Sequence, residues 1–171
     1  MSNERTNGNI GNWKVLTVFY SHSGNTRECA DHIHKKVGGD IVEIIPAEPY
    51  PEDYEAVVKQ AKQELKSGYK PALRTRVENI DSYDVIFVGS PNWWNTVAPP
   101  VMTFLGEHDL SGKAAVPFVT HAGSGLGRSA QDIARLCPGS TVLEGLAVWG
   151  GEVRTAQTQV SEWLRKLGMT G

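Results

Sequence analysis

The stretch VLTVFYSHSGNT, residues 15–26, decides the fold. Its first half, residues 15–20, is an unbroken run of apolar, aromatic and β-branched side chains, which is typical of a parallel strand buried on both faces. Its second half, residues 21–26, is a loop of small and polar residues, and a helix is predicted over residues 25–37, ended by the glycines at 38 and 39. A buried strand that passes through a short polar loop into a helix is the opening unit of an α/β sheet.

The rest of the chain repeats this alternation of short apolar runs and segments with helical spacing. Further strands are predicted at residues 41–45, 84–90, 114–120 and 141–148. One helix is expected to open at Pro51, Glu52 and Asp53, with an apolar stripe of Tyr54, Val57, Val58, Ala61 and Leu65. Others are expected at residues 99–107 and 128–136, and a last one carries Ala156, Val160, Trp163, Leu164 and Leu167 on one face. With right-handed crossovers, the pattern predicts a three-layer α/β/α sandwich around a five-stranded parallel sheet.

Composition limits the classes of protein this chain can be. Its 171 residues suit one domain, and 17 basic against 19 acidic residues give a net charge of −2. This balance offers no basic surface for nucleic acid or anionic lipid, and no apolar run approaches the roughly 20 residues that span a bilayer. Residues 1–12 are polar, lack the pattern of a signal or transit peptide, and are predicted to form a disordered tail before a domain over residues 13–171. A cytoplasmic location is expected, and the sequence does not indicate an oligomeric state.

The two cysteines are too few for a disulfide framework and are not spaced as a metal-binding pair. Cys29 shares a helix face with Ile33 and Val37, and Cys137 ends a helix before Pro138. We predict two buried, unreactive thiols and no metal site.

The loop at residues 21–26 has the composition of an anion-binding site. It offers three side-chain hydroxyls, an amide, a glycine and the free N–H groups of a helix N-terminus, which together favour a phosphate. It contains no lysine and no G-x-x-x-x-G-K motif, so it is not a P-loop for nucleoside triphosphates. The alternative is a helix cap rich in serine and threonine, but a cap needs only one such residue.

Two more unusual loops follow the third and fourth predicted strands. In PNWWN, residues 91–95, two adjacent tryptophans cannot easily both point inward, so at least one is expected to offer a flat face to an aromatic ligand. The alternative is a tryptophan that plugs the sheet edge. In the loop that begins at His121, the histidine and the backbone of residues 123–125 are candidates for hydrogen bonds to the polar edge of such a ligand, although a lone loop histidine can also be structural.

These three loops resemble those of the flavodoxin family over residues 15–149. The segment VFYSHSGNT, residues 18–26, is similar to the S/T-x-T/S-G-N-T signature that wraps the FMN phosphate, and VGSPNWW and VTHAGSGLG resemble the second and third flavin loops of small flavodoxin-like proteins. The resemblance implies strand order 2-1-3-4-5, with FMN between the ends of strands one and three. It implies cofactor contacts from Ser21, His22, Ser23, Gly24, Asn25, Thr26, Pro91, Asn92, Trp93, Trp94, Asn95, Thr120, His121, Gly123, Ser124 and Gly125.

The third loop does not match two other functional motifs that its residues suggest. GSGLG at residues 123–127 is not G-x-G-x-x-G, because Arg128 stands at the third glycine position, so a Rossmann dinucleotide site is disfavoured. Ser124 lacks the G-x-S-x-G frame of a hydrolase nucleophile.

The resemblance leaves three functions open. The first is an electron carrier that exchanges electrons with a redox partner protein. The second is a reductase that takes hydride from NAD(P)H to a quinone or similar small acceptor, and the third is a non-enzymatic FMN-binding or regulatory module. Many carrier flavodoxins are strongly acidic, whereas this chain is nearly neutral and its three loops contain no Asp or Glu, which favours two-electron chemistry. No catalytic residue is assigned. Trp149, after the fifth strand, is the alternative stacking residue if neither loop tryptophan contacts the flavin.

Overall fold

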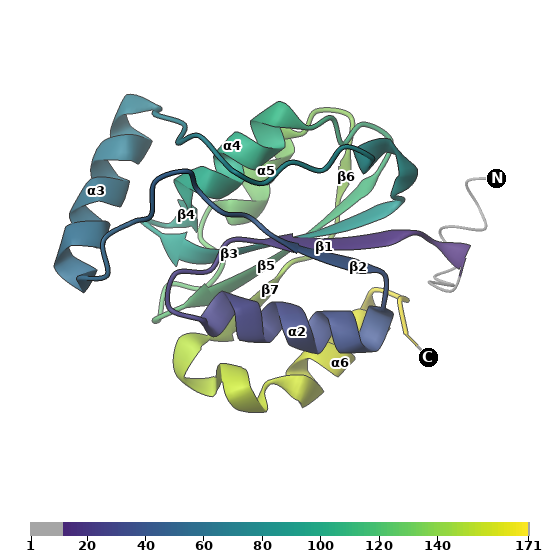
Figure 1. Cartoon of the computed structure of the whole chain (residues 1–171). Coiled ribbons are helices and arrows are strands. Elements are labelled where there is room, and N and C mark those ends of the chain that lie inside the picture. Colours follow the sequence, from purple (N-terminus) through teal and green to yellow (C-terminus); the bar gives the residue numbers. More distant parts are fainter. Residues whose placement is uncertain (1–11, 171) are drawn as a thin grey trace.

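A parallel sheet runs through the middle of the molecule in the computed structural model, which describes residues 12–170 (Figure 1). Its strands are β1 (Val15–Phe19), β2 (Asp40–Glu43), β3 (Val85–Trp93), β5 (Ala114–His121), β6 (Thr141–Val142) and β7 (Leu146–Trp149). The order is β2-β1-β3-β5-β6, β7 also pairs with β5, and the short β4 (Thr96–Val97) pairs antiparallel with β3. With β6 and β7 taken as the predicted fifth strand, this confirms the order 2-1-3-4-5. The predicted tail lies outside the described residues except for Asn12.

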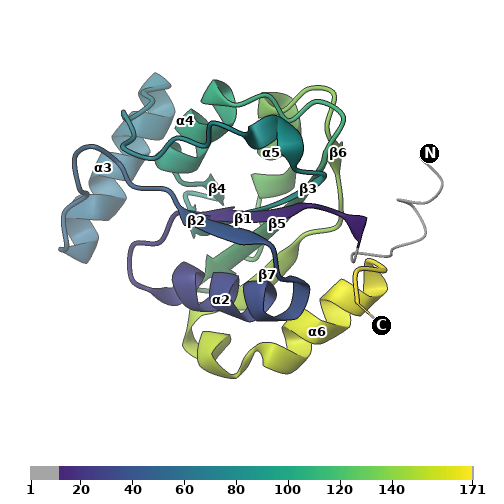
Figure 2. The same cartoon turned by 45° about the vertical axis from the view of Figure 1, so that its right-hand side comes forward.

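Helices cover both faces of the sheet. In Figures 1 and 2, α2 (Asn25–Val37) and α6 (Gln157–Lys166) lie on one face, and α4 (Pro99–Glu107) and α5 (Ser129–Leu136) lie on the other. The predicted three-layer α/β/α arrangement is therefore confirmed. In both views α3 (Tyr54–Ser67) stands apart from these layers, at the end of the sheet where β1 ends. Within residues 12–170, no helix has the length and apolar character needed to cross a membrane.

Two hydrophobic clusters, one on each side of the sheet, form the core. Because side chains alternate along a strand, Leu16 and Val18 of β1 pack with Phe104 on the α4 side, while Val15 and Phe19 face the α2 side. Both cysteines are buried, as predicted, one in each cluster. Burial raises the pKa of the Cys29 thiol to about 12 and that of Cys137 to about 11, so both thiols stay protonated and unreactive.

The centre of the sheet contains one very close contact between β3 and β5. Gly89 lies beneath the ring of Phe118, and a Cβ at position 89 would stand 2.1 Å from the Phe118 Cζ atom. Both residues are buried in neighbouring strands, so neither can move aside. This position of β3 accepts no side chain while the phenylalanine is present.

The predicted fifth strand is interrupted, and a proline opposite explains the break. Residues 116–117 of β5 face residues 143–145, so the outer strand carries one extra residue between β6 and β7. Ala115 accepts a hydrogen bond from the Leu143 N–H at 3.0 Å, and by alternation Pro117 turns toward the same neighbour. Because proline has no N–H, the ladder loses a donor there and the strand bulges.

Helix α3 begins later than predicted. α3 starts at Tyr54, and Asp53 is its N-cap, with a carboxylate oxygen that accepts the Ala56 N–H at 2.9 Å. Pro51 stays outside the helix, so the expectation that it opens the first turn is wrong. The capping carboxylate satisfies an N-terminal N–H and thereby decides the boundary. Two short 3-10 helices, η2 (Ile80–Ser82) and η3 (Gly150–Thr155), complete the connections.

Candidate functional site

The loop between β1 and α2 has the features of an anion cradle. Gly24, at the N-cap of α2, has φ +98°, a left-handed conformation that favours glycine. The Ser21 Oγ accepts the N–H groups of Gly24 and Arg27, both at 3.2 Å, and its own proton is left to donate. Among the described hydrogen bonds, none uses the N–H of Asn25 or Thr26, the first two of α2. These free donors at a helix N-terminus fit a phosphate group.

Thr26 is placed differently from its loop neighbours. It is buried, and its hydroxyl is hydrogen-bonded to the Thr120 hydroxyl at 2.8 Å. This bond joins the start of α2 to the end of β5, across the position of β3. Thr26 therefore holds the first and third loops together, and Thr120 is the one of the two that reaches the cavity described below.

The second loop is a β-hairpin, so the expectation that the third strand ends at residue 90 is wrong. β3 continues through Trp93, which pairs with Thr96 of β4, and only Trp94 and Asn95 form the turn. Both turn residues have positive φ, 54° and 73°, as a two-residue type I′ hairpin requires. A tryptophan in this conformation is uncommon, and such outliers cluster at functional sites.

Asn92 connects this hairpin to the loop after β5. Its amide Nδ2 donates to the Gly125 carbonyl at 2.6 Å, and its Oδ1 accepts the Asn95 N–H at 2.9 Å. The Asn95 carbonyl in turn accepts the Arg128 N–H at 2.6 Å. The second and third predicted flavin loops are therefore joined by two hydrogen bonds, and the bond between Asn95 and Asn92 holds the hairpin turn itself. Asn95 and Gly125 serve this connection and do not line the cavity.

Three other rings surround Trp93. Its ring centroid lies 5.5 Å from that of Tyr20, 5.2 Å from Tyr50 and 5.8 Å from His22, with interplanar angles of 70–79°. Tyr50 also donates its hydroxyl proton to the buried Glu64 of α3. Edge-to-face contacts on several sides fix the orientation of the indole. Burial is the main cause that raises the pKa of both Tyr20 and Tyr50, so both phenols remain neutral.

Trp94 attaches α3 to the hairpin. Its Nε1–H donates to the Val58 carbonyl of α3 at 2.8 Å, and the Lys62 ammonium lies 5.0 Å from the centroid of its ring. The side chain is 46% exposed. Trp94 therefore joins two walls of the site, whereas Trp93 is packed inside it.

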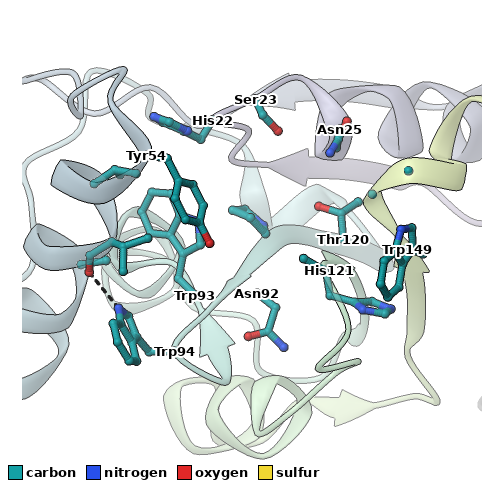
Figure 3. Close-up of a pocket in the computed structure, with 17 residues that line it drawn as sticks. His22, Ser23, Asn25, Tyr54, Asn92, Trp93, Trp94, Thr120, His121 and Trp149 are labelled. Atoms are coloured by element: carbon teal, nitrogen blue, oxygen red, sulfur yellow. Dashed lines mark hydrogen bonds between the residues drawn. The ribbon is translucent and has the colours of Figure 1, made fainter.

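The opposite side of the site is formed by His121 and Trp149. Their rings meet edge to face at 5.9 Å, and the His121 Nδ1 accepts the Gly123 N–H at 2.9 Å. Trp149 is 48% exposed, so much of its indole is free of protein contact. Figure 3 shows Trp93 and His22 on one side and Trp149 with His121 on the other.

Between these two sides lies a cavity of about 480 Å³, which is within the usual range of small-molecule sites. It lies at the carboxyl ends of β1, β3 and β5, where the strand order reverses, as expected for ligand sites in open parallel sheets. Nine of the predicted cofactor residues line it: His22, Ser23, Asn25, Pro91, Asn92, Trp93, Trp94, Thr120 and His121. Seven do not: Ser21, Gly24, Thr26, Asn95, Gly123, Ser124 and Gly125.

One wall of the cavity was not predicted from the sequence. It is the inner face of α3, and the remaining lining comes from Ala122 and the segment after β7. The residues missed are Tyr54, Val57, Val58, Ala61, Ala122, Gly150 and Gly151, while Trp149 was named only as an alternative. The α3 residues are the apolar stripe assigned to a packed helix, and their spacing alone does not separate a core face from a cavity wall. Among the described lining residues none is Asp, Glu, Lys or Arg.

This arrangement defines an open-sheet α/β protein with a cavity at its topological switch point. The family model described as Flavodoxin matches residues 14–167, and the chain belongs to the flavodoxin family. A search of curated proteins gave no match.

Solved structures agree with this family. A candidate flavoprotein from Bacteroides eggerthii is 33% identical with a TM-score of 0.80, and the match covers 91% of this chain and 98% of that one. Another from Bacteroides uniformis is 27% identical with a TM-score of 0.80, covering 90% and 98%. A flavoprotein from Lactobacillus acidophilus, solved in complex with FMN, is 23% identical with a TM-score of 0.69, covering 84% and 97%. At 23% identity, the third match supports the fold alone.

Proposed function

We propose that this chain binds one FMN non-covalently in the cavity and transfers electrons through it. The observation that carries the proposal is the meeting of two features at one switch point: a helix N-terminus with free N–H donors and a cavity with aromatic side chains on two sides. A phosphate fits the first feature and a flat, largely apolar ring fits the second. The FMN complex of the Lactobacillus acidophilus flavoprotein supports the choice of this flavin.

Each part of the site would hold a different part of FMN. The backbone N–H groups of Asn25 and Thr26, with the Ser21 hydroxyl, would bind the phosphate, and the ring would lie between Trp93 and Trp149. When bound, the flavin supplies the one- or two-electron chemistry, and the protein supplies orientation and electrostatics. The neutral phenols of Tyr20 and Tyr50 support Trp93 without adding charge.

A second candidate function is reduction of a quinone or similar small acceptor with NAD(P)H. The observation that favours it is the lining of the cavity, which among the described residues contains no carboxylate to repel an anionic reduced flavin. If the chain is an electron carrier, its partner is another redox protein. Consumption of NADPH by the FMN-loaded protein, measured with and without a quinone, separates the two functions.

Titration of the apoprotein with three flavins tests the proposal. FMN should bind with a shift of its visible absorption bands, and riboflavin should bind at least tenfold more weakly because it lacks the phosphate. FAD should also bind more weakly, because a loop that encloses the phosphate would leave no exit for an adenylate. Equal affinity for FMN and riboflavin would overturn the phosphate assignment, and no binding of any flavin would overturn the proposed function.

A further inference from the structure

Two histidines, His22 and His121, line the cavity. Among the described lining residues, they are the side chains that can change charge near neutral pH, because the others are apolar, amide, hydroxyl or phenol groups. The two rings lie on opposite sides of the cavity (Figure 3). Their hydrogen bonds assign them different capacities to take up a proton.

The ring of His121 has its acceptor nitrogen in use. Its Nδ1 accepts the Gly123 N–H at 2.9 Å, so the ring proton is on Nε2. A second proton at Nδ1 would place two donors against each other and break this bond. The Nδ1 lone pair of His121 is therefore occupied by this bond.

The ring of His22 has the opposite arrangement. Its Nε2 lies 2.8 Å from the Pro51 carbonyl oxygen, which can only accept, so this nitrogen carries a proton. The described hydrogen bonds leave Nδ1 without a partner. His22 can gain or lose a proton at Nδ1 while the bond that fixes its position stays intact.

The other charged groups near His22 are already engaged or turned to other elements. On the adjoining loop, Asp53 caps α3, and on α2 the Arg27 guanidinium is paired with Glu43 of β2. Behind Trp93, Glu64 accepts the hydroxyl proton of Tyr50, and Tyr20 is neutral. Of the other titratable groups, Tyr54 of α3 and His121 line the cavity with His22, and Glu52 of the adjoining loop is exposed. The Lys62 ammonium of α3 lies against the ring of Trp94.

We propose that His22 takes up a proton at Nδ1 when the bound flavin gains two electrons and releases it when the electrons leave. This inference rests on the proposed binding of FMN. A hydride donor such as a reduced nicotinamide gives the ring two electrons and one hydrogen and leaves oxidised, so the flavin gains one negative charge. A proton from water, bound to His22 Nδ1, balances that charge in a cavity whose described lining holds no other cation.

The size of the effect follows from the stoichiometry of the step. One extra proton for every two electrons steepens the plot of midpoint potential against pH by about 30 mV per pH unit over the interval in which the proton is taken up.

Potentiometric titration of the FMN-loaded protein between about pH 5 and 8 tests the inference. The wild type should show the steeper segment, and His22→Gln should lose it, although glutamine keeps a donor for the Pro51 carbonyl. His121→Gln, the matched control from the same cavity, should keep it. NMR of the wild-type imidazoles provides a second measurement: the ring signals of His22 should shift on reduction at constant pH, and those of His121 should move less.

The outcomes separate this inference from the proposed function. A chain that binds no flavin refutes both. If FMN binds and the slope is the same in wild type and His22→Gln, the role of His22 is refuted while the flavin assignment stands. If His121→Gln loses the steeper segment while His22→Gln keeps it, the proton binds to His121, and the proposed role of His22 is refuted as well.

Discussion

Replacement of Trp94 by phenylalanine should loosen α3 while leaving the rest of the fold in place. The change removes the 2.8 Å hydrogen bond from Nε1 to the Val58 carbonyl, which is worth about 0.5–1.5 kcal/mol. It also weakens the contact of the ring with the Lys62 ammonium, worth about 0.5–1 kcal/mol at an exposed site. Because the phenylalanine ring keeps part of the second contact, the substitution should weaken the attachment of α3 by about 1–2 kcal/mol.

Hydrogen exchange measured by mass spectrometry gives the readout. A loss of 1–2 kcal/mol in the local opening free energy should speed exchange of the α3 amides by roughly 5- to 30-fold. Amides of α2, on the other side of the sheet, serve as the internal control and should not change. Lys62→Met, which removes only the cation–π contact, should give the smaller part of the effect.

Two results would refute this reasoning. Unchanged exchange in α3 would mean that other contacts, such as the hydrogen bond between Tyr50 and Glu64, hold the helix without Trp94. Equal acceleration in α2 and α3 would mean that the substitution destabilises the whole fold. In the first case Trp94 would not be what attaches α3, and in the second α3 would not open independently of the rest of the fold.

Ser21→Ala should weaken FMN binding by roughly 10- to 100-fold in fluorescence titrations, because a hydrogen bond to a charged phosphate is worth about 1.5–3 kcal/mol; a similar loss for riboflavin would show instead that the loop had collapsed. Trp93→Leu should brighten the fluorescence of bound flavin and weaken FMN, whereas Trp94→Leu should chiefly affect α3; unchanged emission in the Trp93 variant would transfer the stacking role to Trp149. Asn92→Ala should lower the free energy of unfolding by about 1–3 kcal/mol in urea, since two hydrogen bonds are lost, and an unchanged midpoint would contradict the role given to this side chain.

The fold was largely predictable because its strands are buried on both faces and read as continuous apolar runs. The order of the strands in the sheet was predicted from the resemblance of three loops to a known family, because periodicity alone gives no strand order. Two features of the fold could not be predicted from local sequence patterns. Pro117 breaks the ladder of a strand distant in sequence, and Asp53 sets the start of α3 three residues later than Pro51 indicates.

The site was predicted in part. The loops after β1, β3 and β5 were found because small, polar and aromatic residues follow buried strands directly, and strand ends meet at one edge of the sheet. The wall made by α3 was not found, because Val57 and Ala61 have the spacing of an ordinary packed helix. The hairpin turn at Trp94 and Asn95 was not predicted either, because a Trp-Asn pair does not indicate two residues with positive φ.

The contact between Gly89 and Phe118 has an evolutionary consequence. A Cβ on residue 89 has no room under the phenylalanine ring, so the two positions cannot change independently. In a lineage that acquires alanine at position 89, the residue facing it on β5 should already have become smaller, a change that by itself leaves a void beside Gly89. The reverse order of events would place the new Cβ against the phenylalanine ring. The two sites are therefore expected to covary across descendants of this chain, directly beneath the part of the sheet that carries the cavity.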